Sequence, residues 1–254
     1  MRVNAAAALA ASVGIAALYT VAQSSSDLLA PLSDAVFVIV SGACALFALL
    51  VVLKWGMRGT FGLVQFGLFS AVFLWFLGEV VWSVYELAFR IPIPYPSLAD
   101  VFYLAGYLPA ILGVLQFLSV FGKELRGLRI LLVVMTGLLI IGVTYVSLLR
   151  PLITSSVDLL TKTVDVAYPS LDAILLTLAI AMFIVFEGSE TSYSWLWISL
   201  GLLLTTLADI AFSFGTLEGW YYSGHPIELL WLWGYISLAL GFNDQRRGFA
   251  LGQE

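Results

Sequence analysis

The chain has 254 residues, of which 61% are hydrophobic and only 11% are charged, and its mean hydropathy is +1.03. Soluble domains carry roughly 25% charged residues, so this composition excludes a soluble globular protein. The net charge of −5 and the lack of a run of basic residues argue against binding to nucleic acid. One cysteine and one histidine give no reason to expect an internal disulfide, a metal site or a cofactor.

Apolar segments long enough to cross a bilayer follow one another along the chain. A hydrocarbon core about 30 Å thick needs roughly 20 helical residues. The sequence therefore predicts an all-α, polytopic membrane protein with one transmembrane domain over residues 1–254. Its eight predicted helices span residues 5–22, 35–53, 61–89, 98–122, 130–149, 166–186, 193–216 and 226–243. An alternative interpretation of the first segment, which follows Arg2, is a signal peptide cleaved after Ala22.

Basic residues are distributed unequally between the two ends of these segments. With eight crossings, the side that holds both termini receives eight of them, namely Arg2, Lys54, Arg58, Lys123, Arg126, Arg129, Arg246 and Arg247. The opposite side receives Arg90, Arg150 and Lys162. The positive-inside tendency then places both termini in the cytoplasm of a cell whose plasma membrane holds the chain. The outer side collects most of the acidic residues, so its mouth should attract cations.

Two parts of the sequence look like copies of each other. The segment VFYLAGY at 101–107 matches LLWLWGY at 229–235, and each follows an outer loop, a proline and an acid. When Tyr107 is aligned with Tyr235, Glu79 lies 28 residues upstream of the first tyrosine and Asp209 lies 26 residues upstream of the second. The third and fourth predicted helices therefore match the seventh and eighth, which favours an arrangement of four repeated helix hairpins.

Acids that follow a proline at the start of a predicted helix have two interpretations. Proline and a nearby acid suit the first turn of a helix, so Asp34 and Asp172 are predicted to cap helix N-termini. Asp100 and Glu228 differ, because each shares a helical face with two aromatic residues at i+3 and i+7. Those aromatic residues are Tyr103, Tyr107, Trp231 and Tyr235. An interfacial aromatic belt is the alternative explanation for them.

Two acids are predicted near the middle of the membrane. Glu79 lies 11 residues before Arg90 and Asp209 lies 10 before Gly219, which places each roughly 15 Å below the outer boundary. A charged carboxylate costs at least ~2.5 kcal/mol there, which favours a ligand, ion or proton site. The alternative is a set of hydrogen bonds that joins helices. Polar stripes on the same faces contain Glu79, Trp82, Ser83 and Glu86 in one helix and Thr205, Asp209, Phe212, Ser213 and Thr216 in the other.

Other aromatic and titratable residues receive simpler interpretations. His225 is expected to be a solvated loop residue, with a pH-sensing group beside Glu228 as the alternative. An interfacial belt accounts for the remaining cluster of Trp195, Trp197, Trp220, Tyr221 and Tyr222.

Residues Phe76 to Phe242 resemble the multi-pass membrane sensory modules at the N-terminus of bacterial diguanylate cyclases (GGDEF proteins) and of some histidine kinases. The segments that carry the resemblance are GE at 78–79, YPSLADVFYLAGY at 95–107, YPSLD at 168–172, AD at 208–209 and GHPIELLWLWGY at 224–235. Glu79 and Glu228 stand where such modules usually have aspartate. The resemblance implies signal input, and because only twelve residues follow Phe242, signalling would need a separate kinase or cyclase subunit. A weaker resemblance, in topology and two acids, is to lysoplasmalogenase-like hydrolases.

These observations predict a sensory or ligand-binding membrane module with an outward-facing acidic and aromatic pocket, without catalytic residues. The predicted ligand-binding residues are Glu79, Asp209, Asp100, Glu228, Tyr103, Tyr107, Trp231 and Tyr235. Membrane lipid and a separate signalling subunit are the expected partners, and a homodimer is compatible with the sequence. Two alternatives stay open, a small proton- or cation-coupled transporter and an intramembrane hydrolase of the lysoplasmalogenase type.

Overall fold

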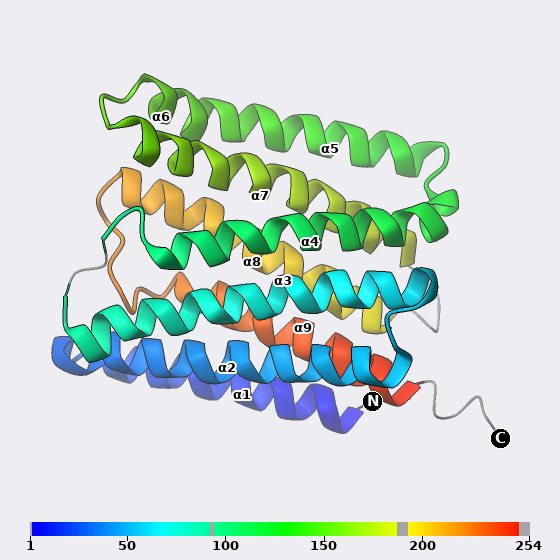
Figure 1. Cartoon of the computed structure of the whole chain (residues 1–254), viewed down its shortest axis with the longest axis horizontal. Coiled ribbons are helices and arrows are strands. Elements are labelled where there is room, and N and C mark those ends of the chain that lie inside the picture. Colours follow the sequence, from blue (N-terminus) through cyan, green and yellow to red (C-terminus); the bar gives the residue numbers. More distant parts are fainter. Residues whose placement is uncertain (1, 92–93, 187–192, 249–254) are drawn as a thin grey trace.

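A computed structural model describes residues 2–91, 94–186 and 193–248, and within these ranges the chain forms helices and connecting loops without a strand (Figure 1). The long helices are α1 (Arg2–Ala22), α2 (Ser26–Trp55), α3 (Gly59–Ser83), α4 (Leu98–Phe121), α5 (Leu128–Thr144), α7 (Leu159–Phe186), α8 (Tyr193–Leu217) and α9 (Glu228–Gly248). Shorter helical segments extend three of them, namely η1 (Val84–Phe89) after α3, η2 (Gly122–Glu124) after α4, and η3 (Tyr145–Leu149) with α6 (Arg150–Thr154) after α5.

Six helical segments of the described chain are long and apolar enough to cross a membrane, so the prediction of a polytopic helical membrane protein is confirmed. They are Asp27–Trp55, Gly59–Phe89, Leu98–Phe121, Leu128–Thr154, Leu159–Val185 and Tyr193–Leu217. The count of eight is not reached by length and composition. The apolar part of α1 is shorter, at Ala6–Ala22, and α9 ends in a polar stretch that includes Arg246 and Arg247.

Two predicted helix starts are wrong, and with them the prediction that Asp34 and Asp172 are caps. Helix α2 begins nine residues earlier than expected and α7 begins seven residues earlier, with Pro31 and Pro169 inside them. Proline is tolerated inside membrane helices because neighbouring groups satisfy the backbone that it frees. Asp34 and Asp172 therefore lie within helices, 3% and 0% exposed.

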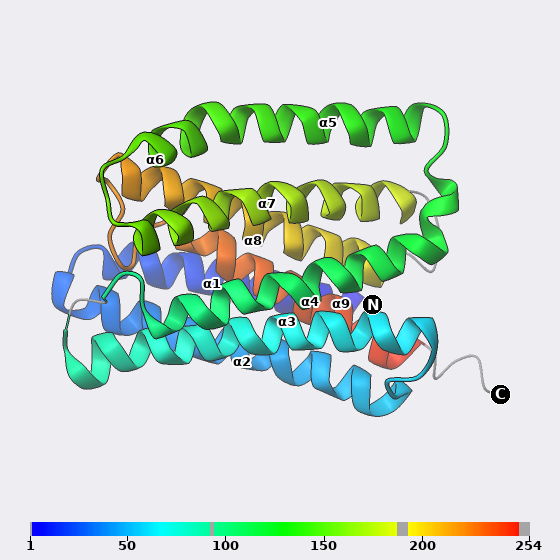
Figure 2. The same cartoon turned by 45° about the horizontal axis from the view of Figure 1, so that its top comes forward.

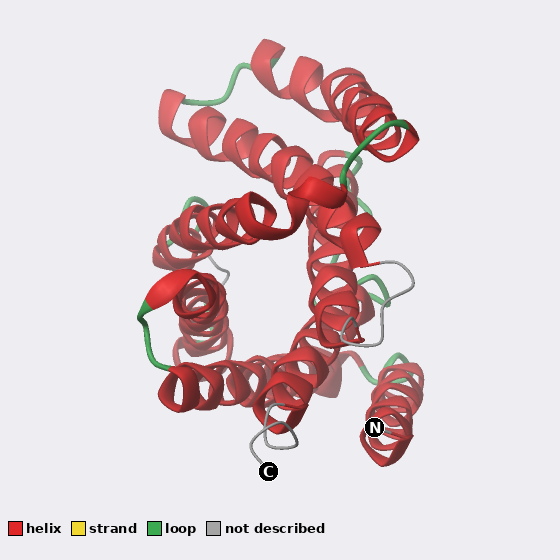
Figure 3. Ribbon diagram, turned by 90° about the vertical axis from the view of Figure 1, so that its right-hand side faces the viewer, coloured by secondary structure: helices red, strands yellow, loops and turns green. Residues whose placement is uncertain are grey.

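Six helices form a closed ring. Going around it, α2 packs on α3, α3 on α4, α4 on α7, α7 on α8, α8 on α9, and α9 back on α2. Figure 3 shows this ring from one end, with other helices outside it. Helix α1 packs mainly on α9, and α5 packs on α7 with its large side chains, such as Leu138 and Leu139, mostly exposed. An apolar helix exposed in this way has the surface expected of a lipid-facing element.

The ring consists of two similar sets of three helices, α2–α3–α4 and α7–α8–α9, which occupy opposite halves of it. Matching glycines support this correspondence. Gly106 of α4 packs on Trp75, four residues before Glu79, and Gly234 of α9 packs on Thr205, four residues before Asp209. Pro31 and Pro169 each precede an acid by three residues in the remaining pair of helices, α2 and α7. Within the ring, the correspondence therefore extends to sets of three helices.

Helix α1 begins and α9 ends at the same end of the bundle (Figures 1 and 2). Trp195 lies near this end. The prediction that it belongs to an interfacial belt is wrong. Its side chain is 6% exposed, with ring centroids 4.6 Å from Phe117 and 6.0 Å from Phe61. This aromatic cluster fills the interior of the ring at the end near the termini, so the interior is open only toward the other end.

Candidate binding cavity

A cavity of about 590 Å³ lies inside the ring, in the half of the bundle away from the two termini. Its lining includes Tyr95, Val157 and Leu217, which are 48%, 42% and 41% exposed, so it reaches the surface at that end. Six acidic residues line it, namely Asp34, Glu79, Asp100, Asp165, Asp209 and Glu228. Among the described residues that line the cavity there is no lysine, arginine or histidine. The interior is therefore rich in hydrogen-bond acceptors and poor in positive charge.

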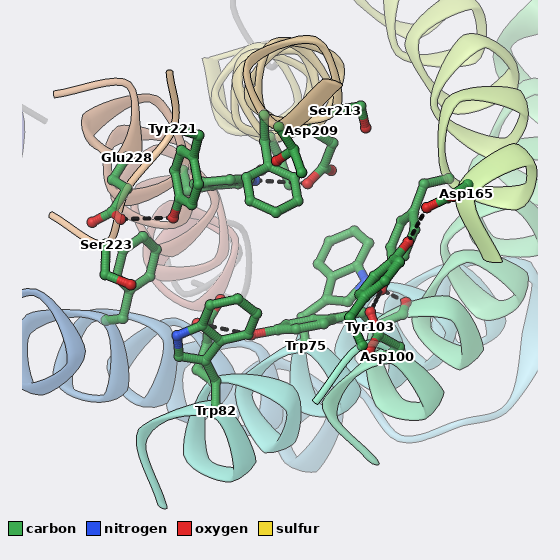
Figure 4. A pocket seen from close by; sticks show the side chains of 18 of the residues that line it. Trp75, Trp82, Asp100, Tyr103, Asp165, Asp209, Ser213, Tyr221, Ser223 and Glu228 are labelled. Carbon is green, nitrogen blue, oxygen red and sulfur yellow. Dashed lines mark hydrogen bonds between the residues drawn. The ribbon is translucent and has the colours of Figure 1, made fainter. Parts of the chain in front are cut away.

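Eleven aromatic side chains complete the wall of the cavity (Figure 4). They are Phe37, Trp75, Trp82, Tyr95, Tyr103, Tyr107, Tyr168, Phe212, Tyr221, Trp231 and Tyr235. All eight residues that the sequence suggested for ligand binding lie along this lining. The belt interpretation does not hold for Tyr107 and Tyr235, because these side chains are 3% and 2% exposed.

Glu79 and Asp209 lie opposite each other at the inner part of the cavity and bind their donors in the same way. Glu79 of α3 accepts hydrogen bonds from Tyr103 of α4 and Tyr235 of α9, both at 3.1 Å. Asp209 of α8 accepts from Trp231 of α9 at 2.8 Å and from Tyr107 of α4 at 3.2 Å. Each acid thus takes one donor from its own three-helix set and one from the other set. These crossed bonds tie the two halves of the ring together.

Tyr107 contacts two acids at once. Its hydroxyl lies 2.5 Å from Asp172 Oδ1 and 3.2 Å from Asp209 Oδ2. A tyrosine hydroxyl has a single proton to donate, so both contacts are hydrogen bonds only if one carboxyl group is protonated and donates back. Asp172 Oδ2 is buried without a hydrogen-bond partner among the described residues, which makes an ionised Asp172 costly. The geometry fits a pair of acids that share a proton.

Asp34 of α2 occupies the ring position that corresponds to Asp172 of α7. Its Oδ2 is likewise buried without a hydrogen-bond partner in the described part of the chain, and its carboxyl group interacts with Glu86. Unlike Asp172, Asp34 lines the cavity directly. The two three-helix sets therefore each contribute a second, under-satisfied acid beside Glu79 or Asp209, and an occupant of the cavity can reach the one on α2.

Asp100 closes the N-terminus of α4. Its Oδ2 accepts hydrogen bonds from the backbone N–H of Ser97 at 2.6 Å and from the Ser97 hydroxyl at 2.8 Å. The Ser97 hydroxyl oxygen in turn accepts from the Ala99 N–H at 3.2 Å, so Ser97 and Asp100 form a capping box. Its Oδ1 accepts from Tyr168 of α7 at 2.9 Å. Asp100 thus lines the cavity while it fixes the start of α4 against α7.

Glu228 at the start of α9 is the most fully hydrogen-bonded of these acids. Its Oε2 accepts from Ser33 at 2.5 Å and from Tyr19 at 3.0 Å, and its Oε1 accepts from Tyr221 at 2.8 Å and from the Gly224 N–H at 2.7 Å. The Tyr221 bond is visible in Figure 4. Glu228 thereby joins α1, α2 and the loop before α9. The prediction that Tyr221 belongs to an interfacial belt is wrong, because this side chain forms part of the cavity wall.

The rim of the cavity is held by further side-chain bonds. Tyr95 donates to Asp165 at 2.6 Å, and burial together with this carboxylate raises the pKa of Tyr95 above its ordinary value. Glu86 accepts from Trp82 at 3.3 Å and from Ser223 at 3.0 Å. These bonds join the loops before α4 and before α9 to α7 and η1, so side-chain contacts hold the rim together.

His225 lies in the loop before α9 but does not line the cavity. It is half-buried rather than fully solvated, with ring centroids 5.1 Å from Trp220 and 4.9 Å from Tyr222. Its Nδ1 accepts a hydrogen bond from the Ile227 N–H at 3.2 Å. Burial lowers the pKa of His225 below its ordinary value, because the charged form loses hydration.

Several residues of the site lie outside the eight that the sequence suggested for ligand binding. The polar stripes had already pointed to Trp82, Phe212 and Thr216, all of which line the cavity. Tyr168 and Asp165 gave a weaker signal, because the predicted start of the sixth helix left them at its edge. Asp172 was misassigned because a proline three residues earlier resembles a helix start.

Comparison of the chain with protein-family models, with curated proteins and with solved structures gives no match. What the site does is therefore argued from the cavity itself.

Proposed function

We propose that this chain is a membrane ligand-binding module of the sensory type, and that its cavity takes a cationic organic ligand. One observation carries the proposal: six carboxylates and eleven aromatic side chains surround the cavity, with no lysine, arginine or histidine in its described lining. Carboxylates supply the opposite charge, and aromatic faces attract a cation through their quadrupoles. A neutral, apolar ligand would not offset the free-energy cost of placing these acids close together in the interior of the ring.

The acids have different roles in the proposed binding site. Glu79 and Asp209 lie at the inner end of the cavity and are partly exposed to it, and each is positioned by two hydrogen-bond donors. They are the anchors for a positive group. Asp100 and Glu228 are committed to the starts of α4 and α9, and contribute negative potential at the rim. Tyr103, Tyr107, Trp231 and Tyr235 form the aromatic wall between anchors and rim.

The proposed orientation places the cavity mouth outside a plasma membrane and both termini in the cytoplasm, with α1 and α9 as the first and last of eight crossings. Supporting this, α1 and α9 run beside the six long apolar helices (Figure 2). The eight-to-three excess of basic residues on the terminal side points the same way.

Signal output would follow from the crossed bonds. Glu79–Tyr235 and Asp209–Tyr107 connect the two three-helix sets across the ring interior. A cation that competes for these carboxylates weakens the bonds and shifts one set relative to the other. A separate kinase or cyclase subunit on the cytoplasmic side, as the resemblance implies, would read that shift.

The contact of the Tyr107 hydroxyl with both Asp172 and Asp209, which fits a proton shared by the two acids, favours a second candidate, a small cation transporter coupled to protons. A cation bound at Asp209 would repel the shared proton from the pair, which couples the two ions in opposite directions. Uptake or pH-linked flux in proteoliposomes separates this candidate from a sensor, because a pure sensor binds its ligand without flux.

The proposal is tested by ligand-dependent thermal stabilisation of the purified chain across a panel of primary to quaternary amines and metal cations. We expect at least one cation to raise the unfolding midpoint. Glu79→Gln and Asp209→Asn should each weaken its binding by roughly tenfold to a hundredfold, since a hydrogen bond to a charged group contributes about 1.5–3 kcal/mol. Glu218→Gln removes an exposed acid outside the cavity lining and serves as the matched control. Stabilisation by anions instead, or equal binding by all variants, contradicts the proposal.

A further inference from the structure

A second hollow, of about 430 Å³, lies on the outside of the ring where α1 meets α2 and α9. Alanines form most of its α1 side, at Ala7, Ala8 and Ala11. Aliphatic residues such as Ile39 and Leu240 form the opposite side. Because the small side chains of α1 leave space against the larger ones of the ring, the hollow is an apolar groove that faces the membrane. It shares no lining residue with the acidic cavity.

The length of this groove matches one leaflet of a bilayer. Along α1 it extends from Ala7 to Ile15, which is about 12 Å at 1.5 Å per residue. Along α9 it extends from Ile236 to Arg247, about 16 Å by the same rise. Half of a hydrocarbon core about 30 Å thick is about 15 Å. A lipid acyl chain lying in the groove would therefore run from the middle of the membrane to its surface.

The surface end of the groove is basic. Arg246 and Arg247 line it, and the Lys54 Nζ donates to the Arg246 carbonyl oxygen at 2.5 Å, which adds a third positive charge. No acid belongs to the described lining of this groove. The Arg246 side chain lies over Phe47, with one Nη donating to Asn243 at 3.2 Å, while its buried Nε has no hydrogen-bond partner within the described residues. An unpaired buried N–H on a guanidinium needs an acceptor.

We propose that this groove binds an anionic phospholipid, with one acyl chain along α1 and the phosphate at Arg246 and Arg247. Basic pockets between membrane helices near the surface are suited to anionic lipid headgroups. The phosphate would lie at the end of the groove that Arg246 and Arg247 line, and the apolar length of the groove has the dimensions of a chain in one leaflet. A second copy of the protein would bring its own Arg246 and Arg247 to the same place if the contact were symmetric, which like charges disfavour. The inference is independent of the cavity and of its ligand.

The test measures lipid retention by the intact chain, purified from mixed micelles that contain equal amounts of phosphatidylglycerol and phosphatidylcholine, with native mass spectrometry as the readout. We expect preferential retention of one phosphatidylglycerol molecule. The preference should fall about fivefold for each arginine removed in Arg246→Gln and Arg247→Gln, because a basic residue near the surface contributes about 1 kcal/mol to binding an anionic lipid. Arg58→Gln removes a charge at the same end of the bundle but outside the groove, and should leave the preference unchanged.

A second variant keeps the test decisive if Arg246→Gln folds poorly. Ala11→Leu fills the groove from an exposed position of α1 and retains high helix propensity, so it should abolish retention while the helix stays intact. Equal retention of both lipids by the unmodified chain overturns the proposal, as does retention that survives both Ala11→Leu and Arg247→Gln. Disulfide-linked dimers formed through Ala11→Cys would assign the groove to a second copy and would overturn it as well.

Discussion

Glu79 and Asp209 are held by tyrosine and tryptophan donors rather than by cationic side chains. Inside a membrane, a lysine or arginine beside the acid would neutralise its charge and remove its attraction for a cation. A hydroxyl or indole N–H holds the carboxyl group in place without cancelling its charge. The sequence predicted these two acids and their aromatic neighbours, because the depth of a residue in an apolar helix can be counted. It could not predict the crossed pairing, which depends on how distant helices meet.

Replacing a single hydroxyl tests these contacts. Tyr107→Phe removes a donor that two acids share, whereas Tyr235→Phe removes one of the two donors to Glu79. We expect Tyr107→Phe to lower the free energy of unfolding by about 1–3 kcal/mol and Tyr235→Phe to lower it by less. Thermal unfolding in detergent measures both, with Tyr145→Phe, at an exposed position, as the control. If Tyr107→Phe unfolds at the same temperature as the control, the shared contact does not stabilise the chain.

His225 predicts a dependence of stability on pH. Because burial lowers its pKa in the folded chain, the unfolded chain binds more protons near the ordinary histidine pKa of about 6.5, so this contribution to stability is full above that pH and declines as the pH falls below it. His225→Phe keeps the ring contacts with Trp220 and Tyr222 but cannot be protonated. Its stability relative to the unmodified chain should therefore rise between pH 7 and pH 5 in unfolding experiments. Parallel curves over that range would show that His225 does not titrate differently on folding.

At the scale of the helices, local sequence predicted most helix starts and failed at two. Helices α3, α4 and α8 begin within two residues of their expected positions. For α3 and α4, a loop with glycine or proline precedes the helix. Helices α2 and α7 continue through Pro31 and Pro169 in the upstream direction. Proline is a strong local signal for a helix start, and only packing against neighbouring helices decides whether the helix extends before it. That extension is what moves Asp34 and Asp172 from helix ends to the interior.

Close helix packing depends on particular glycines. A Cβ at Gly67 of α3 would lie 2.9 Å from the Pro109 carbonyl oxygen of α4, and one at Gly241 of α9 would lie 2.6 Å from the Ser194 carbonyl oxygen of α8. Backbone atoms cannot move aside as a side chain can, so Gly67→Ala and Gly241→Ala should each cost about 1–3 kcal/mol of unfolding free energy. A Cβ at Gly142 of α5 would meet nothing within 4 Å, so Gly142→Ala should be neutral or slightly stabilising. Equal effects of all three substitutions would contradict this packing.

At the scale of the whole molecule, a closed ring of six helices leaves an interior that neither three-helix set can enclose alone. Apolar periodicity predicted that the chain crosses the membrane repeatedly, and the matched segments at 101–107 and 229–235 predicted an internal repeat. The sequence could not show that α1 and α5 stay outside the ring, since their composition resembles that of the other helices. It also could not show that the acids of both sets face one space, because this requires ring closure between α2 and α9.

The presence of an acidic cavity that opens at the end of the bundle away from the termini can be tested without knowing the ligand. Ser213→Cys places a thiol in the lining, while the native Cys44 is 0% exposed and gives no background. Thiosulfonate reagents that carry either a trimethylammonium or a sulfonate group then report the local potential by their relative rates, with Ser24→Cys in the exposed turn between α1 and α2 as the reference. We predict that the cationic reagent modifies Ser213→Cys faster than the anionic one by at least about tenfold relative to that reference. Equal relative rates, faster modification by the anionic reagent, or protection from both would contradict the account.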